Sequence, residues 1–86
     1  MPIVTVRYWA AAKHAAGVAE ETFDAATLAE ALAAAVARRA AAQEFRQVLA
    51  RSSFLVNGEL APGHAAKAVP LAEGAVIEVL PPFAGG

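Results

Sequence analysis

The sequence contains no cysteine, and this absence removes several kinds of site at once. Disulfides, cysteine-based zinc sites and thiol nucleophiles all require a cysteine side chain. The two histidines, His14 and His64, are far apart in the chain, and neither has a second imidazole or a carboxylate at helix-face spacing. A metal site would have to be assembled entirely by tertiary structure, and we expect none.

The sequence also lacks a charge imbalance and any long apolar run. Seven Lys and Arg residues oppose eight Asp and Glu residues, so the net charge is −1 and we expect neither nucleic acid nor a membrane surface as a partner. Apolar residues make up 58% of the sequence, and 25 of these residues are alanine. Arg38 and Arg39 interrupt the Ala-rich middle of the chain. That middle is far shorter than the roughly 20 apolar residues of a bilayer span. The first residues show no secretory-signal pattern, so we expect a cytoplasmic protein.

Motifs of autonomous catalysis are missing as well. No Gly-rich phosphate loop precedes a predicted helix, and no Gly-x-Ser-x-Gly sequence occurs. An active site contained within this chain is therefore not expected. Two sets of charged residues are interpreted as solvated surface groups rather than functional ones: Glu20, Glu21, Glu73 and Glu78, and Arg38, Arg39, Arg46 and Arg51.

Alternation of apolar and polar residues, together with one hairpin signal, predicts five strands. Residues 3–9 place Val4, Val6 and Tyr8 on one side and Trp9 on the other. Residues 18–24 are expected to pair back as a second strand, after an Ala-rich connection. Asn57-Gly58 follows an apolar run and predicts a two-residue hairpin between a third and a fourth strand. Residues 75–80 predict the last strand.

One strong helix is predicted between the second and third strands. The spacing of Thr27 and Glu30 is that of a capping box, and Leu28, Leu32 and Val36 recur on one face. Residues 43–51 predict a second, shorter helix or a continuation of the first.

The order β-β-α-(α)-β-β-β predicts an α+β domain with a mixed sheet packed on one main helix, which is a β-grasp arrangement. We expect a single domain over residues 1–80, followed by an extended tail over residues 81–86. Pro62, Gly63 and Pro70 mark a loop before the last strand.

The tail is the most unusual part of the sequence. Pro81 and Pro82 stiffen the exit from the sheet, because each fixes its own φ and neither can donate to a ladder. Gly85 and Gly86 carry no side chain, so they can thread a narrow channel and present a bare carboxylate. These features favour a reacting or docking role for the tail over an incidental one.

With these features, the chain resembles the ubiquitin-like sulfur carriers, and most closely the family of small subunits of molybdopterin synthase. The likeness spans nearly the full length. It is carried by Val-Arg-Tyr-Trp-Ala in the first strand, by Val-Asn-Gly at the hairpin, and by the stretch from Leu-Ala-Glu-Gly to the Pro-Pro-Phe-Ala-Gly-Gly end. Two positions depart mildly from the family pattern: Ala75 replaces the usual Asp, and Trp9 replaces the usual Phe.

The resemblance implies a non-catalytic, sulfur-donating subunit. A ubiquitin-activating-type adenylyltransferase would use ATP to adenylate the Gly86 carboxylate, so this chain would bind no cofactor itself. The thiocarboxylate that follows would donate the sulfur of the molybdopterin dithiolene within molybdopterin synthase. The large subunit of that synthase is the implied partner, in a heterotetramer.

The surface that meets a partner is expected at the root of the tail. If Tyr8 faces the helix, alternation turns Trp9 and Leu80 outward, and the hairpin brings Leu60 beside them. The alternative places Trp9 in the core and Tyr8 outside. Phe83 is expected at the mouth of the partner's channel. The predicted partner contacts are Trp9, Leu60, Leu80, Pro81, Pro82, Phe83, Ala84 and Gly85.

Three other interpretations compete with this one. The same sulfur chemistry could serve thiamine or cysteine biosynthesis. A Gly-Gly end could instead form isopeptides, as in a ubiquitin-like protein modifier. The third is a plain β-grasp binding module with an incidental tail, since a fold alone does not specify function.

Overall fold

The computed structural model describes residues 1–61 and 69–82. The predicted loop residues Pro62 and Gly63 and the tail residues 83–86 lie outside the described residues. In chain order the elements are β1 (Ile3–Tyr8), α1 (Ala10–Ala16), β2 (Glu20–Asp24), α2 (Leu28–Ala37), α3 (Gln43–Arg51), β3 (Ser53–Val56), β4 (Glu59–Ala61) and β5 (Val76–Leu80).

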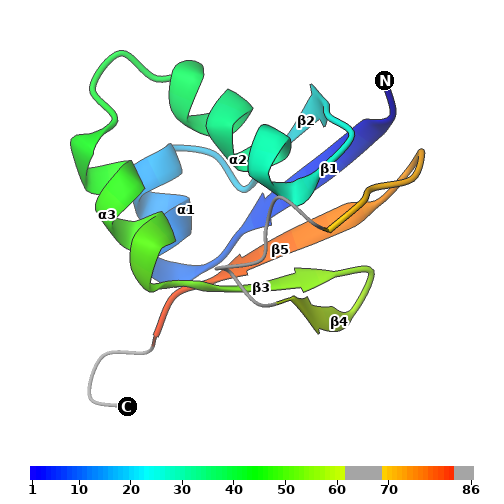
Figure 1. The fold of residues 1–86 in the computed structure, drawn as a ribbon. Helices are drawn as coiled ribbons and strands as arrows, with labels where there is room; N and C mark the ends of the chain where they lie inside the picture. The colour runs from blue at the N-terminus through cyan, green and yellow to red at the C-terminus, as the bar shows by residue number, and fades with distance from the viewer. Residues whose placement is uncertain (62–68, 83–86) are drawn as a thin grey trace.

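The strands form one mixed sheet in the order β2-β1-β5-β3-β4. The first and last strands, β1 and β5, are neighbours and run parallel, whereas the other pairs are antiparallel. A parallel pair needs a crossover, and the chain between β1 and β5 contains the helices that supply it. The helices lie on one side of the sheet (Figure 1). This architecture confirms the predicted α+β class and β-grasp arrangement.

Alternation sets which face of each strand is buried. Val4, Val6 and Tyr8 of β1 are at most 2% exposed, and so are Ile77 and Val79 of β5. These side chains point toward the helices, because residues two apart on a strand share a face. One core cluster also contains these buried apolar residues: Ala12, Phe23, Ala25, Leu28, Ala31, Ala35, Phe45, Val48, Leu49, Phe54, Ala61, Leu71 and Ala75.

The predicted hairpin and helix cap are both present. Asn57 and Gly58 join β3 to β4 with φ of 51° and 84°, values that suit these two residue types. Thr27 caps α2 by accepting a hydrogen bond of 3.2 Å from the backbone N–H of Glu30. The Glu30 carboxylate reaches back one residue further than a simple capping box requires and accepts from the N–H of Ala26 at 2.8 Å.

The Ala-rich segment expected to be a connection is instead helix α1. Alanine has the highest helix propensity, but only Ala12 is buried there, so no stripe of large apolar residues marked the helix in the sequence. Gly17 ends α1 in the left-handed conformation, with φ of 82°. The second strand then starts at Glu20, and Val18 lies before it, 43% exposed.

The structure also separates the two later helices. Helix α2 ends at Ala37, and α3 begins after Ala42, whose backbone is not helical. Phe45, Val48 and Leu49 are the buried residues of α3, as their spacing predicted. The ring of Phe45 meets the ring of Tyr8 edge to face, with centroids 5.5 Å apart. Within residues 1–61 and 69–82, the predicted main helix is therefore one of three helices.

Candidate functional site

The tail leaves the domain at the end of β5. Leu80 is the last strand residue and pairs with Ser53 at the start of β3. Pro81 is buried and Pro82 is exposed, so the first proline packs against the domain and the second lies at its surface. The predicted site residues Phe83, Ala84, Gly85 and Gly86 lie outside the described part of the chain.

Trp9 stands beside this exit. Tyr8 pairs with Val79, and the backbone N–H of Trp9 donates to the carbonyl of Val79 at 3.3 Å. The side chain of Tyr8 is 2% exposed, and that of Trp9 is 47% exposed. The prediction that Trp9 faces outward and Tyr8 inward is therefore confirmed. Ala10 follows at a φ of 50°, a conformation uncommon for residues other than glycine, and turns the chain into α1.

Leu60 lies on the same outer face but not beside Trp9. It is 71% exposed and pairs with Leu55, which in turn pairs with Glu78 of β5. Leu55 and Glu78 therefore separate Leu60 from Trp9, because β3 and β5 lie between β4 and β1. The hairpin therefore does not bring Leu60 beside Trp9 as expected, although the two residues share a face. We call the outward-facing surface made by Trp9, Leu55, Leu60, Glu78 and Leu80 the outer face.

Two residues of the outer face were missed as functional candidates. The indole Nε1–H of Trp9 donates a hydrogen bond of 3.2 Å to the Glu78 carboxylate. Leu55 is half-buried between Glu78 and Leu60. The parity of each strand could have indicated both residues, but only the register shows which of them are neighbours.

The helix side of the sheet contains a charged cluster that the sequence did not indicate. Glu21 and Arg39 were expected to be solvated, yet their side chains are only 10% and 12% exposed and form an ion pair of 2.7 Å. Arg39 also donates to the carbonyls of Ala16 and Ala35, and its guanidinium lies 4.4 Å from the ring centroid of Phe45. This guanidinium therefore links α1, α2 and β2 beneath the surface.

The same cluster shifts two pKa values in opposite directions. Burial raises the pKa of Tyr8, and the hydrogen bond of 2.7 Å that its hydroxyl donates to the negative Glu21 carboxylate adds to the increase. Burial alone would raise the pKa of Glu21, but hydrogen bonds from Tyr8 and Arg39 and the positive charges of Arg39 and Arg38 outweigh it, so the pKa is lowered. Tyr8 stays neutral and Glu21 stays ionised, which suits a structural cluster.

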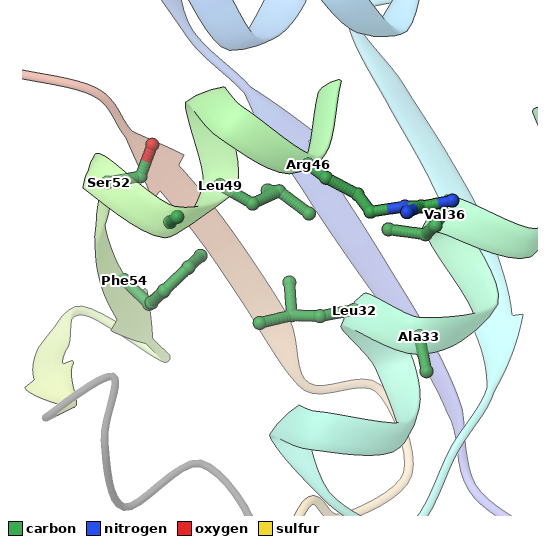
Figure 2. Close-up of a pocket in the computed structure, with 8 residues that line it drawn as sticks. Leu32, Ala33, Val36, Arg46, Leu49, Ser52 and Phe54 are labelled. Atoms are coloured by element: carbon green, nitrogen blue, oxygen red, sulfur yellow. The ribbon is translucent and has the colours of Figure 1, made fainter. Parts of the chain in front are cut away.

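A shallow apolar groove lies between α2 and α3, with a volume of about 480 Å³. Figure 2 shows Leu32 of α2 and Leu49 of α3 on its two sides, with Phe54 of β3 at one end. Arg46 and Ser52 are the polar residues of its lining, so the groove has no pair of groups suited to acid–base catalysis. The groove lies on the helix side, away from the outer face.

Within residues 1–61 and 69–82, no group of three or more potential ligands from His, Asp and Glu is placed to hold a metal ion. Across those residues, no helix combines the length and the apolar character needed to cross a membrane.

Comparison with known proteins supplies a second line of evidence. The model of the ThiS family matches residues 6–86. No curated protein matches the sequence significantly.

Several solved structures resemble this chain over nearly its whole length. In a complex of subunits 1 and 2 of the molybdopterin-converting factor from Helicobacter pylori, the matching chain is 26% identical, with a TM-score of 0.69 over 98% of this chain and 99% of that one. SAMP1 from Haloferax volcanii is 24% identical, with a TM-score of 0.79 and coverage of 98% and 99%. The small archaeal modifier protein 1 (SAMP1) from Methanosarcina acetivorans is 20% identical, with a TM-score of 0.77 and coverage of 100% and 98%. At these identities, the two SAMP1 structures establish a shared fold alone.

Proposed function

Because this chain belongs to the ThiS family, we propose that it is a sulfur carrier for molybdenum cofactor biosynthesis, with Gly86 as the reacting residue. The observation that carries the sulfur-carrier proposal is the family match, which extends through the Gly-Gly sequence at residues 85–86. The likeness to a subunit of the molybdopterin-converting factor from Helicobacter pylori supports the choice of pathway. A β-grasp domain that ends in this way can present a carboxylate at some distance from its body.

The proposed chemistry takes place on the Gly86 carboxylate. An activating enzyme joins this carboxylate to AMP and releases pyrophosphate from ATP. A sulfur nucleophile at the oxidation level of sulfide then attacks the acyl carbon and displaces AMP, which is a far better leaving group than oxide. The product is a thiocarboxylate. The ATP site and the acid–base groups belong to the activating enzyme in this proposal, in keeping with the lack of a Gly-rich phosphate loop in the sequence.

The proposed partner of the outer face is the large subunit of molybdopterin synthase. Support comes from the Helicobacter pylori structure, in which the two subunits of the molybdopterin-converting factor form a complex. The exposed side chains of Trp9 and Leu60 and the half-buried Leu80 lie on the same side of the sheet, and Trp9 and Leu80 lie near the root of the tail. Such exposed apolar surface on a small protein is typical of an interaction site.

Intact-mass spectrometry tests the sulfur-carrier proposal directly. The chain is co-expressed with an adenylyltransferase and a sulfurtransferase from the same organism, and its mass is compared with that of the chain expressed alone. We expect an increase of about 16 Da, the difference between sulfur and oxygen, on the C-terminal peptide. An unchanged mass in the presence of active partners would contradict the proposal.

A second candidate function is protein modification, because the Methanosarcina acetivorans protein that shares this fold is named a small archaeal modifier protein. A modifier would leave Gly-Gly remnants on lysines of target proteins after proteolysis, whereas a carrier would leave none. Mass spectrometry therefore distinguishes a modifier from a carrier. Gly-Gly remnants without any thiocarboxylate would favour the modifier.

A third possibility is a carrier for thiamine or cysteine biosynthesis, which has the same mass change but a different acceptor enzyme. Co-purification of the untagged chain separates these pathways by the identity of the stable partner that it brings with it.

A further inference from the structure

The outer face has a carboxylate in the middle of its apolar residues. Glu78 lies on β5, in register with Arg7 of β1 on one side and Leu55 of β3 on the other. Its side chain is half-buried, and Leu80 follows it on the same face two residues later. A partner that covers Trp9, Leu55 and Leu80 must therefore cover Glu78 as well.

Within residues 1–61 and 69–82, Glu78 forms no ion pair, although the cation Arg7 lies opposite it in the register. Arg7 is the cation in register with it, but the Arg7 Nε atom instead pairs with Glu20 at 3.3 Å. Within residues 1–61 and 69–82, the hydrogen bond to the Glu78 side chain comes from the neutral indole of Trp9, at 3.2 Å. This bond orients the carboxylate and the indole together but adds no positive charge.

Association would remove this carboxylate from water. Burial of an ionised carboxylate without a counter-charge is strongly unfavourable, and it becomes acceptable when the partner supplies a cation with suitable hydrogen bonds. A planar guanidinium fits the site best, because it can donate to a carboxylate and stack on the neighbouring indole.

We propose that the outer face binds a basic patch of the molybdopterin synthase large subunit, in which an arginine side chain pairs with Glu78 and stacks on Trp9. This inference rests on the proposed function, since it takes the large subunit as the partner of the outer face. Glu78 then determines specificity: it favours a surface that combines apolar side chains with a cation and disfavours one with a carboxylate at the same place.

The substitution Glu78→Gln separates the charge from the hydrogen bond to Trp9. The glutamine carbonyl still accepts from the indole, so the orientation of Trp9 is kept while the negative charge is lost. Glu59→Gln is the matched control, because Glu59 is an exposed carboxylate of the same sheet. It is adjacent to Leu60 on β4 and therefore lies on the opposite face of the sheet from the outer face. Trp9→Ala reports whether the outer face docks at all.

Binding of the full chain and each variant to the purified large subunit is measured by calorimetry at low and high salt. We expect Glu78→Gln to weaken binding about 10- to 100-fold at low salt, with a smaller effect at high salt, and Glu78→Arg to weaken it further. Glu59→Gln is expected to bind within about twofold of the parent. Circular dichroism checks that each variant is folded.

The outcomes distinguish this inference from the proposed function. If Trp9→Ala weakens binding and Glu78→Gln does not, the arginine inference is overturned and the docking face stands. If the parent chain acquires the thiocarboxylate but no variant changes binding, the outer face is the wrong surface and the sulfur-carrier function stands. A parent chain that gains no thiocarboxylate would contradict the proposed function itself.

Discussion

The guanidinium of Arg39 donates a 2.7 Å hydrogen bond to the carboxylate of Glu21, at a position where both side chains are almost nine-tenths buried. Arg39 follows the end of α2, and Glu21 lies on β2. The pair therefore ties the end of the main helix to the edge of the sheet. The hydroxyl of Tyr8 donates to the same carboxylate, so the pair is also anchored to the central part of the sheet.

Replacement of Arg39 by methionine should destabilise the domain by about 3 kcal/mol, because it leaves the Glu21 carboxylate buried with a weaker counter-charge. Arg38→Met is the control. Arg38 contacts the same carboxylate at 3.5 Å, but its side chain is 51% exposed, so we expect a loss below about 1 kcal/mol. Urea unfolding measures the free energy of unfolding of both variants. Equal losses of stability would show that burial of the Arg39–Glu21 pair does not strengthen it.

Stability should fall in acid because of Glu21. Its pKa is lowered in the folded state from an ordinary value of 4.5, so the unfolded chain takes up the proton first as the pH falls. The stabilising contribution is present above that ordinary value and is lost as the pH falls through the folded-state pKa. The variant Glu21→Gln should show a flatter pH dependence of the free energy of unfolding below pH 4.5. Parallel curves for the two proteins would assign acid sensitivity to other carboxylates.

Trp9→Ala should leave the domain folded and weaken its binding to the large subunit by about 2 kcal/mol or more, since an exposed Trp at an interface often acts as an anchor. Val18→Ala is a suitable control, because Val18 is 43% exposed and lies outside the outer face. Thermal unfolding and calorimetry together check this. Loss of folding in Trp9→Ala would mean that the indole supports the core despite its exposure.

The two prolines at the tail root should respond differently to substitution. Pro81 is buried, so Pro81→Gly should lower stability by about 1 to 2 kcal/mol through lost packing and a freer unfolded chain. Pro82 is exposed, so Pro82→Gly should leave stability nearly unchanged and weaken partner binding by about 1 kcal/mol through added tail freedom. Unchanged binding in both variants would show that stiffness at the tail root is unimportant.

Deletion of Gly86 should abolish thiocarboxylate formation without a change in the melting temperature. The reacting carboxylate would move to Gly85 and fall one residue short of the activating site. A chain extended by one alanine tests the opposite displacement. Mass spectrometry after co-expression with the activating partners measures the product, and sulfur transfer by the shortened chain would refute the role of Gly86.

Local signals predicted much of this fold. Alternation identified the strands, Thr27 and Glu30 marked the start of α2, and Asn57-Gly58 marked the hairpin. Helix α1 was not predicted, because its seven residues are mostly alanine, which favours a helix without indicating a buried face.

The order of apolar and polar residues along each strand was enough to determine that Trp9 faces outward and Tyr8 inward, because alternate residues on a strand point to opposite faces. It could not determine which outward residues are neighbours. That depends on the sheet order β2-β1-β5-β3-β4 and on the register, which place Glu78 between Arg7 and Leu55, within reach of the Trp9 indole, and keep Leu60 apart. Likewise, only the tertiary structure determined that Arg39 and Glu21 are buried. A charged residue in a sequence is normally solvated, and these two are buried because α2 and β2, far apart along the chain, bring a guanidinium and a carboxylate within hydrogen-bonding distance.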